Sequence, residues 1–226
     1  MLIGVPKEIK THEYRVGMTP SSVREAISRG HSVLVESDSA EKIGITDQDY
    51  IAAGAIIAGS AEEVWGKSEM IVKVKEPQKS EYSFINSNMI LFTYLHLAPD
   101  PDQAEALINS GCSAIAYETV TDHKGGLPLL APMSMVAGRM SIQCGAHFLE
   151  ISKGGRGQLL GGVPGVPAAK VVIFGGGIVG TNAAKMAVGL GADVYIFDLN
   201  PSRLSELDQI FGTSITTLYP TIDVIE

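Results

Sequence analysis

Residues 170–198 read KVVIFGGGIVGTNAAKMAVGLGADVYIFD, and this stretch decides the fold of the second half of the chain. An apolar run ends in Gly175-x-Gly177-x-x-Gly180, a helical pattern follows, and a second apolar run ends at Asp198. Glycines at this spacing allow a tight turn and let a pyrophosphate approach the backbone N–H groups at the start of a helix. The glycine pattern alone is common in turns, but here a strand precedes it and a helix follows. The stretch therefore predicts a βαβ unit that binds a dinucleotide.

Asp198 indicates which dinucleotide. A carboxylate at the end of the second strand accepts hydrogen bonds from both ribose hydroxyls and repels a 2′-phosphate, which favours NAD over NADP. The alternative is that Asp198 only caps a helix predicted at 201–211. Arg203, within that helix, either lies near the adenosine or faces solvent as a surface charge.

The alternation of strands and helices continues after this stretch. Strands are predicted at 170–175, 192–198 and 214–218, with helices at 177–190 and 201–211 between them. This is one βαβαβ half of a dinucleotide-binding fold, and a complete fold needs a second half. We therefore expect a truncated Rossmann domain, either a fragment of a longer product or a naturally shortened one.

The first half of the chain also alternates between strands and helices. Apolar runs predict strands at 2–5, 32–36, 70–74, 89–95 and 112–117. Helix starts are indicated by Thr19-Pro20, by Ser60 with Glu63 at capping-box spacing, and by Asp100-Pro101. Such alternation predicts a mostly parallel sheet. The predicted fold class is α/β, with a Rossmann-like parallel-sheet domain before the incomplete dinucleotide-binding domain.

A long helical pattern at 132–152 connects the two parts. It carries small residues, which are expected where one helix packs closely on another: Ala137, Gly138, Gly145 and Ala146. A glycine-rich stretch at 154–165 follows and reads as a linker or close-approach loop. We place the domain change near residue 130, giving a substrate domain over 1–130 and a connecting helix with the NAD-binding domain over 131–226.

Composition excludes several classes of protein. The net charge of −8 argues against nucleic acid or an anionic membrane as the main partner. The N-terminus does not read as a signal peptide, and no run approaches the roughly 20 apolar residues of a spanning helix. Cys112 and Cys144 are too few for a disulfide scaffold and show no metal-ligand spacing. We expect both as buried thiols in a cytoplasmic protein that binds no metal.

Four polar residues lie directly after a predicted strand or in the loop that follows one: Arg15, Lys75, His96 and Glu118. In open α/β sheets ligands bind beyond the carboxyl ends of the strands, so these side chains are expected at one edge. Two cations there would hold a substrate carboxylate and polarise its carbonyl, and the histidine would transfer a proton. Glu118 is expected to orient Lys75 or a backbone group. Taken singly, Arg15 and Lys75 are better explained as solvated charges, and His96 as a surface or hydrogen-bonded histidine.

Several motifs together closely resemble the alanine dehydrogenase family over the whole chain. They are GVPKEIK-x-x-E-x-R-V at 4–16, VKVKEP at 72–77, TYLHLA at 93–98, and the run from APMSMVAGRM at 131–140 to GGRGQLLGGVPGV at 154–166. The resemblance implies reversible NAD-dependent deamination of L-alanine to pyruvate and ammonia. It also implies a homo-oligomer, since relatives are hexamers, and a further catalytic aspartate that would lie beyond Glu226.

The resemblance assigns roles to individual residues. It implies that Arg15 and Lys75 bind the substrate and that His96 is the catalytic acid/base. It implies cofactor contacts from Ser134, Gly175, Gly177, Ile178, Val179, Gly180, Asp198 and Arg203.

Other interpretations stay open. The chain could be the NAD-binding subunit of a proton-translocating transhydrogenase, which would bind NAD without oxidising an amino acid, and His96 is not expected there. Saccharopine-type dehydrogenases are a more distant option. A shortened, inactive nucleotide-binding homologue is the non-enzyme alternative, supported by the strand at 170–175, which would lack its usual neighbour.

Overall fold

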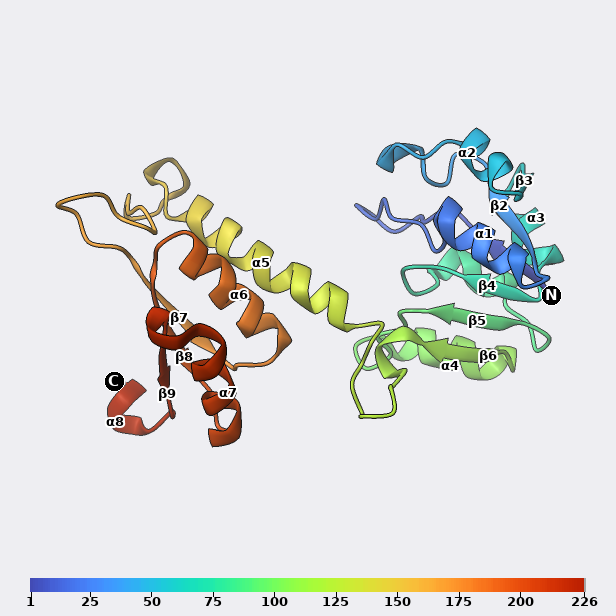
Figure 1. Cartoon of the computed structure of the whole chain (residues 1–226). Helices are drawn as coiled ribbons and strands as arrows, with labels where there is room; N and C mark the ends of the chain where they lie inside the picture. Colours follow the sequence, from blue (N-terminus) through green and yellow to red (C-terminus); the bar gives the residue numbers. More distant parts are fainter. Residues whose placement is uncertain (226) are drawn as a thin grey trace. The chain divides into compact units, whose positions relative to one another are not determined.

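The computed structural model describes residues 1–225 and divides the chain into two compact units, Met1–Leu127 and Pro128–Glu226 (Figure 1). The sequence places this change near residue 130. Each unit is built on its own parallel sheet, and each has its own buried apolar clusters.

The first unit is a doubly wound α/β domain. Its strands are β1 (Leu2–Val5), β2 (Ser32–Glu36), β3 (Ile56–Ala58), β4 (Met70–Val72), β5 (Ile90–Thr93) and β6 (Ser113–Ala116). Within Met1–Leu127 they form one six-stranded sheet in the order β3-β2-β1-β4-β5-β6, and every neighbouring pair is parallel. This order places a topological switch point between β1 and β4, where such folds bind ligands.

Helices cover both faces of this sheet. They are α1 (Pro20–Ser28), α2 (Asp47–Ala52), α3 (Ala61–Lys67) and α4 (Pro101–Ser110), with short 3-10 turns at Glu41–Ile43, Lys79–Phe84 and Tyr117–Thr119. Successive side chains of a strand point to opposite faces. Val33 and Val35 therefore pack in the cluster of α1 and α2, whereas Leu34 packs with Trp65 of α3. Apolar residues at consecutive strand positions are thus explained by burial on both sides.

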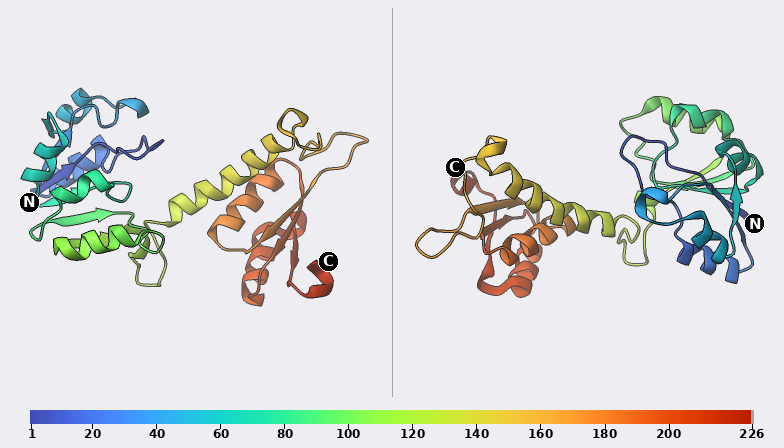
Figure 2. Two further views of the ribbon diagram at one scale, coloured as in Figure 1. Left: turned by 180° about the vertical axis from the view of Figure 1, so that it is seen from behind. Right: turned by 90° about the horizontal axis from the view of Figure 1, so that it is seen from above.

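The second unit begins with α5 (Ala131–Phe148) and a 3-10 turn at Ile151–Lys153. It continues with β7 (Lys170–Phe174), α6 (Ile178–Gly189), β8 (Asp193–Phe197), α7 (Pro201–Phe211), β9 (Thr216–Leu218) and α8 (Ile222–Ile225). In the described residues its strands form a parallel sheet in the order β7-β8-β9, so β7 lies at an edge. Helices α5 and α6 lie side by side in both views of Figure 2 and share many contacts.

The predicted α/β class is confirmed, but several boundaries differ. Strands β4, β5 and β6 are shorter than the apolar runs that predict them. The runs continue because Val74, Tyr94 and Leu95 are buried after leaving the strands. Strand β3 was not predicted, because its three residues are too few to show a periodicity. Helix α5 ends at Phe148 rather than near residue 152. Within residues 1–225, no helix is long and apolar enough to cross a membrane.

Two cap predictions need correction. Thr19 precedes α1, but its side chain makes no capping hydrogen bond. Ser60 caps α3 by accepting the Glu63 N–H, whereas the Glu63 carboxylate accepts the N–H of Gly59. The reciprocal bond of a capping box would go to Ser60 itself. The spacing of Ser60 and Glu63 predicted the Ser60 cap, but it did not predict that the Glu63 carboxylate accepts the N–H of Gly59.

The prediction of two buried thiols is wrong. Cys112 is half-buried, and Cys144 is exposed on α5. Cys112 precedes β6, which is an edge strand of the first sheet. The prediction rested on the general preference of free cysteine for the interior, and that preference does not fix which face of a helix a residue occupies.

Candidate functional site

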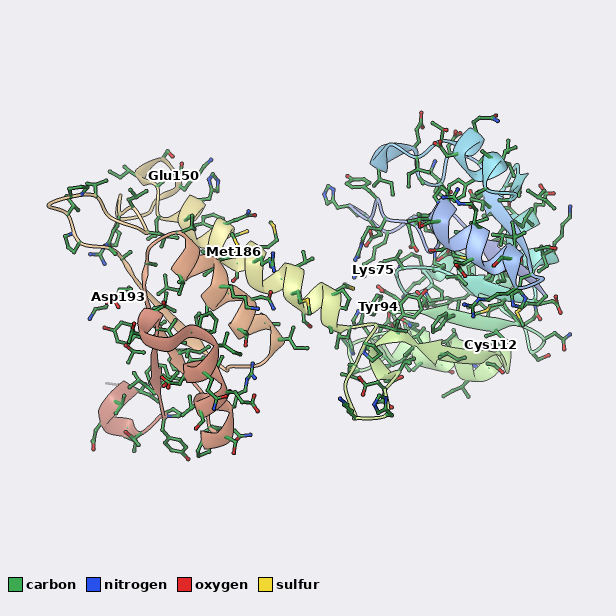
Figure 3. All side chains as sticks on the ribbon, viewed as in Figure 1. Lys75, Tyr94, Cys112, Glu150, Met186 and Asp193 are labelled. Atoms are coloured by element: carbon green, nitrogen blue, oxygen red, sulfur yellow. The ribbon has the colours of Figure 1, made fainter. Side chains whose placement is uncertain are left out.

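The carboxyl edge of the first sheet carries the predicted substrate-site residues. Lys75, His96 and Glu118 follow the adjacent strands β4, β5 and β6, whereas Arg15 lies in the N-terminal segment (residues 6–18) after β1, the other neighbour of β4. Parallel strands end at the same edge, so the topology brings these four segments to one end of the sheet. Figure 3 shows Lys75 and Tyr94 at this end and Cys112 at the opposite end of the strands.

Hydrogen bonds tie the β4 turn (residues 73–77) to the end of β5. The Thr93 hydroxyl donates to the Lys75 carbonyl oxygen at 2.8 Å. The Tyr94 N–H donates to the Val74 carbonyl oxygen at 3.3 Å. The backbone that carries Lys75 is therefore held against its neighbour beyond the end of the regular sheet.

Arg15 is held by a carboxylate of its own segment. Its Nε donates to Glu13 at 2.7 Å, and the Glu13 side chain is buried while Arg15 is half-exposed. This hydrogen bond lowers the pKa of Glu13 below its usual value. Burial raises the pKa of Tyr94, and the Arg15 charge opposes that rise, which places the Tyr94 hydroxyl in the field of Arg15. The guanidinium is thus oriented before any ligand arrives.

Glu118 holds the backbone of His96. Its Oε1 accepts the His96 N–H at 2.7 Å and the Leu95 N–H at 3.2 Å. His96 has a φ of +47°, in the left-handed region that few non-glycine residues adopt. Its ring stacks on Tyr94 with 5.8 Å between centroids, and Nδ1 lies 3.8 Å from Glu118. Of the two expectations for Glu118, the contacts match the one in which it orients a backbone group.

Those N–H groups also set the charge of Glu118. Burial raises the pKa of its carboxyl, but the backbone donors, His96 foremost, lower it by more, so the net shift is downward. Glu118 is therefore an anion beside His96 at neutral pH.

A group of buried charges that was not predicted lies beside this edge: Glu8, Lys73 and Glu81. Lys73 Nζ lies 2.8 Å from Glu81 and 3.3 Å from Glu8. Burial raises the pKa of Glu8, and the Lys73 charge opposes the rise. The available signal was a lysine inside the apolar run at 70–74, because a charge within a buried strand requires partners.

The second unit holds the predicted cofactor residues around the glycine-rich turn. An open pocket of about 560 Å³ lies against β7, α5 and the start of α6. Six predicted cofactor residues line it: Ser134, Gly175, Gly177, Ile178, Val179 and Gly180. Ser134 comes from α5, so helix packing brings it to the turn from a distant part of the sequence.

The glycines of this turn suit a dinucleotide for separate reasons. Gly175 has a φ of +95°, which an L side chain rarely adopts. A Cβ at Gly180 would lie 1.9 Å from the Gly175 carbonyl oxygen, so only glycine allows this approach of helix to strand. A Cβ at Gly177 would meet nothing within 4 Å, which leaves open space above the first turn of α6. The first N–H groups of a helix have no intrahelical partner and suit a phosphate.

Asp198 and Arg203 do not line this pocket, and both contact Gly176. Asp198 follows β8 and accepts the Gly176 N–H at 2.6 Å and the Asn200 N–H at 2.8 Å. The Asn200 and Gly176 N–H groups lower its pKa. Arg203 Nε donates to the Gly176 carbonyl oxygen at 2.7 Å, and its Nη2 donates to Thr181 at 2.8 Å. Arg203 therefore holds the glycine-rich turn in place, whereas the predictions for it were a position near the adenosine or a solvent-facing surface charge.

Comparison with known proteins agrees with this architecture. Residues 4–137 match the family described as alanine dehydrogenase/PNT, N-terminal domain, and residues 141–226 match its C-terminal domain. An alanine dehydrogenase from Methanococcus maripaludis is 57% identical over 218 residues, which are 96% of this chain and 58% of that protein. One from Bacillus subtilis is also 57% identical over 218 residues, covering 96% of this chain and 57% of that protein. The chain thus spans less than two thirds of the length of these relatives.

Solved structures give the same result. An L-alanine dehydrogenase matches with a TM-score of 0.94 and 55% identity over all of this chain and 62% of that one. A transhydrogenase from Sinorhizobium meliloti matches with a TM-score of 0.84 at 23% identity, covering all of this chain and 65% of that one, which is a likeness of fold. Since the N-terminal match alone covers more than half of the residues and the C-terminal match continues to residue 226, this chain belongs to the alanine dehydrogenase/PNT family.

Proposed function

We propose that this chain carries the substrate-binding and NAD-binding parts of an L-alanine dehydrogenase. The reaction is the reversible conversion of L-alanine, NAD and water to pyruvate, ammonium, NADH and a proton. One observation carries the proposal: Lys75, His96 and Glu118 follow three adjacent strands of one sheet, with Arg15 in the segment after the neighbouring strand. Identity of 57% to proteins named alanine dehydrogenase supports it.

The substrate roles follow from charge and reach. Arg15 presents a planar fork that suits a carboxylate, and Lys75 is a point charge that polarises the carbonyl of pyruvate. His96 accepts a proton as water adds to the imine carbon of oxidised alanine, and it returns a proton to the departing amine. Positioned acid/base groups of this kind contribute about 10²–10⁴ in rate.

The cofactor roles rest on the glycine-rich turn. The N–H groups in the first turn of α6 would bind the pyrophosphate, and the Asp198 carboxylate would accept hydrogen bonds from the ribose hydroxyls. Bound NAD would take up the hydride that leaves the alanine Cα. Ser134, Ile178 and Val179 line the same pocket and would exclude water from it. Arg203 would keep the turn in shape through Gly176.

Among the alternatives, the NAD-binding subunit of a transhydrogenase receives less support, because that likeness stands at 23% identity against 55% for an alanine dehydrogenase. The expected homo-oligomer and the expected cytoplasmic location stay predictions. An inactive nucleotide-binding homologue is separated from the enzyme by the assay below.

The test is NADH formation from L-alanine and NAD at alkaline pH, where release of a proton favours deamination. The chain is compared with its His96→Ala variant, and NAD binding is measured for both. We expect alanine-dependent NADH formation that falls at least about 100-fold in the variant while NAD affinity stays the same. A folded wild-type chain that binds NAD but neither L-alanine nor pyruvate would contradict the dehydrogenase proposal and favour the inactive homologue.

A further inference from the structure

The charge cluster of Glu8, Lys73 and Glu81 has no part in the chemistry proposed above. All three side chains are at most 5% exposed, and Lys73 lies between the two carboxylates. An ionised group in the interior is unfavourable unless it is paired and hydrogen-bonded. Replacing such a cluster by apolar side chains is often neutral or stabilising, so stability alone is a weak reason for its presence.

Glu8 contacts more than its ion-pair partner. One oxygen faces Lys73, and the other accepts the Val74 N–H at 2.6 Å and the Lys75 N–H at 3.3 Å. The second carboxylate of the cluster differs at this point, because Glu81 uses its other oxygen to accept the N–H of Gln78. Glu8 is therefore the member of the cluster whose carboxylate reaches the backbone of Lys75.

The same N-terminal segment is attached to β4 and its turn at two further points. Lys10 forms an ion pair with Glu76. A Cβ at Gly17 would lie 2.2 Å from the Val72 carbonyl oxygen, so the segment passes directly over the end of β4. Glu8 is the buried one of these three attachments. Through them, the segment that carries Arg15 and the turn that carries Lys75 are fixed to each other.

We propose that Glu8 is a positioning residue of the substrate site, which sets the backbone of Lys75 relative to the segment that carries Arg15. This inference rests on the proposed function, in which Arg15 and Lys75 bind one substrate. Two cations that hold a small keto acid must keep their spacing to within about 0.5 Å. Both lie outside regular secondary structure, so the spacing depends on side chains that join the two segments.

The test compares Glu8→Gln with the matched variant Glu81→Gln in the full chain. A carboxylate has two acceptor oxygens and a primary amide has one, so either variant can serve only one of its two partners. Both variants remove one negative charge beside the Lys73 ammonium, but only Glu8→Gln can loosen the Lys75 backbone. The measurements are pyruvate binding by calorimetry, NADH binding by fluorescence, and the amide resonances of residues 74 and 75.

We expect Glu8→Gln to weaken pyruvate binding about 10-fold or more, as loss of a supporting hydrogen bond commonly does. NADH affinity should stay within about twofold, because the cofactor residues lie in the other unit. Glu81→Gln should keep pyruvate affinity within about threefold at a similar loss of thermal stability. If Glu8→Gln does not fold, Glu8→Asp takes its place. Glu8→Asp keeps the charge but shortens the side chain, and it should weaken pyruvate binding by less than about 10-fold but measurably.

The outcomes are distinguishable. Equal pyruvate affinity in the wild type and Glu8→Gln, or equal weakening by both glutamine variants, would overturn the positioning role alone. Wild-type affinity in Glu8→Asp would overturn it as well. A folded wild-type chain that binds no pyruvate would overturn the proposed function and the present inference with it.

Discussion

The backbone of His96 is a strained point that one side chain stabilises. A left-handed conformation is unfavourable for a non-glycine residue by about 1–2 kcal/mol. Glu118 offsets this by accepting the N–H groups of both Leu95 and His96. The imidazole is thereby presented from a turn that the chain would not adopt by itself.

Glu118→Ala should therefore destabilise the first unit and displace His96. The variant leaves two N–H groups without their acceptor, which lowers the free energy of unfolding by about 1–3 kcal/mol. Urea unfolding followed by the fluorescence of Trp65, the only tryptophan in the sequence, measures the change. Glu118→Gln retains an acceptor and should lose less than half as much. Equal unfolding midpoints for the two variants would contradict this account.

Asp198 predicts a pH dependence in the second unit. Its pKa lies below the ordinary value of 3.8 because the Asn200 and Gly176 N–H groups bind the ionised form. A lowered pKa in the folded state means that the carboxylate stabilises the unit fully above pH 3.8. This contribution is lost as pH falls through the lower folded-state pKa.

Asp198→Asn removes that titration. The difference in unfolding free energy between wild type and variant should be constant above the ordinary pKa of Asp and shrink toward low pH. Thermal unfolding by circular dichroism over an acid series measures it, and other titrating groups cancel in the difference. A difference that does not vary with pH would show that the two N–H contacts do not select the ionised form.

At the level of elements, the packing of α5 on α6 depends on one glycine. A Cβ at Gly138 would lie 2.2 Å from the Val179 carbonyl oxygen. Val179 also lines the pocket beside the glycine-rich turn. The distance between the two helices therefore bears directly on the shape of the proposed cofactor site.

Gly138→Ala should destabilise the second unit and weaken NAD binding, with Gly145→Ala as control in the same helix. The first change forces α5 away from α6 and lowers the unfolding free energy by about 1–3 kcal/mol. A Cβ at Gly145 would meet nothing within 4 Å, so alanine there should stabilise the helix, by up to about 1 kcal/mol. Opposite signs for the two variants in thermal unfolding are the expected result. Destabilisation by both would indicate that α5 tolerates no added side chain at either position.

At the level of the whole molecule, the two units have separate cores and separate candidate sites. The single tryptophan, Trp65, is buried in the first unit. Its fluorescence reports on that unit, whereas circular dichroism reports on the helices of both. Comparison of the two signals therefore distinguishes unfolding of the first unit from unfolding of the second.

NAD should stabilise the second unit selectively. A ligand present at about 100 times its dissociation constant stabilises the state that binds it by about 2.7 kcal/mol. We expect NAD to raise the temperature of the part of the circular dichroism transition that does not coincide with the Trp65 transition, and to leave the Trp65 transition unchanged. Omission of NAD, and NADP in its place, are the controls, since Asp198 disfavours a 2′-phosphate. An equal shift in both signals would mean that the units unfold as one cooperative body.

The alternation of elements could be predicted from the sequence because it is written in local patterns. Five of the six strands of the first sheet and the βαβαβ order of the second unit were predicted, β1 and β2 with the observed ends and β4, β5 and β6 with shifted ends. The ends shifted because an apolar side chain records burial, and Val74 and Leu95 are buried outside the ladder. Strand β3 was missed because three residues carry too little pattern.

The candidate site was predictable only in its outline. The rule that parallel strands end at one edge was enough to group Lys75, His96 and Glu118. No local pattern shows that Glu118 binds the His96 backbone, that Arg203 binds Gly176, or that Glu8 reaches Lys75. Each of these contacts joins residues at least 22 positions apart in the chain.

The sequence by itself therefore determined the class of fold, the glycine-rich turn and the candidate residues, because periodicity, glycine spacing and residue chemistry act over a few neighbouring positions. The tertiary structure alone decided which side chains meet. It placed Ser134 beside the glycine-rich turn and buried Lys73 between two carboxylates. The physical reason is that pairing and burial depend on close packing between distant segments, and that packing exists only once the whole sheet has formed.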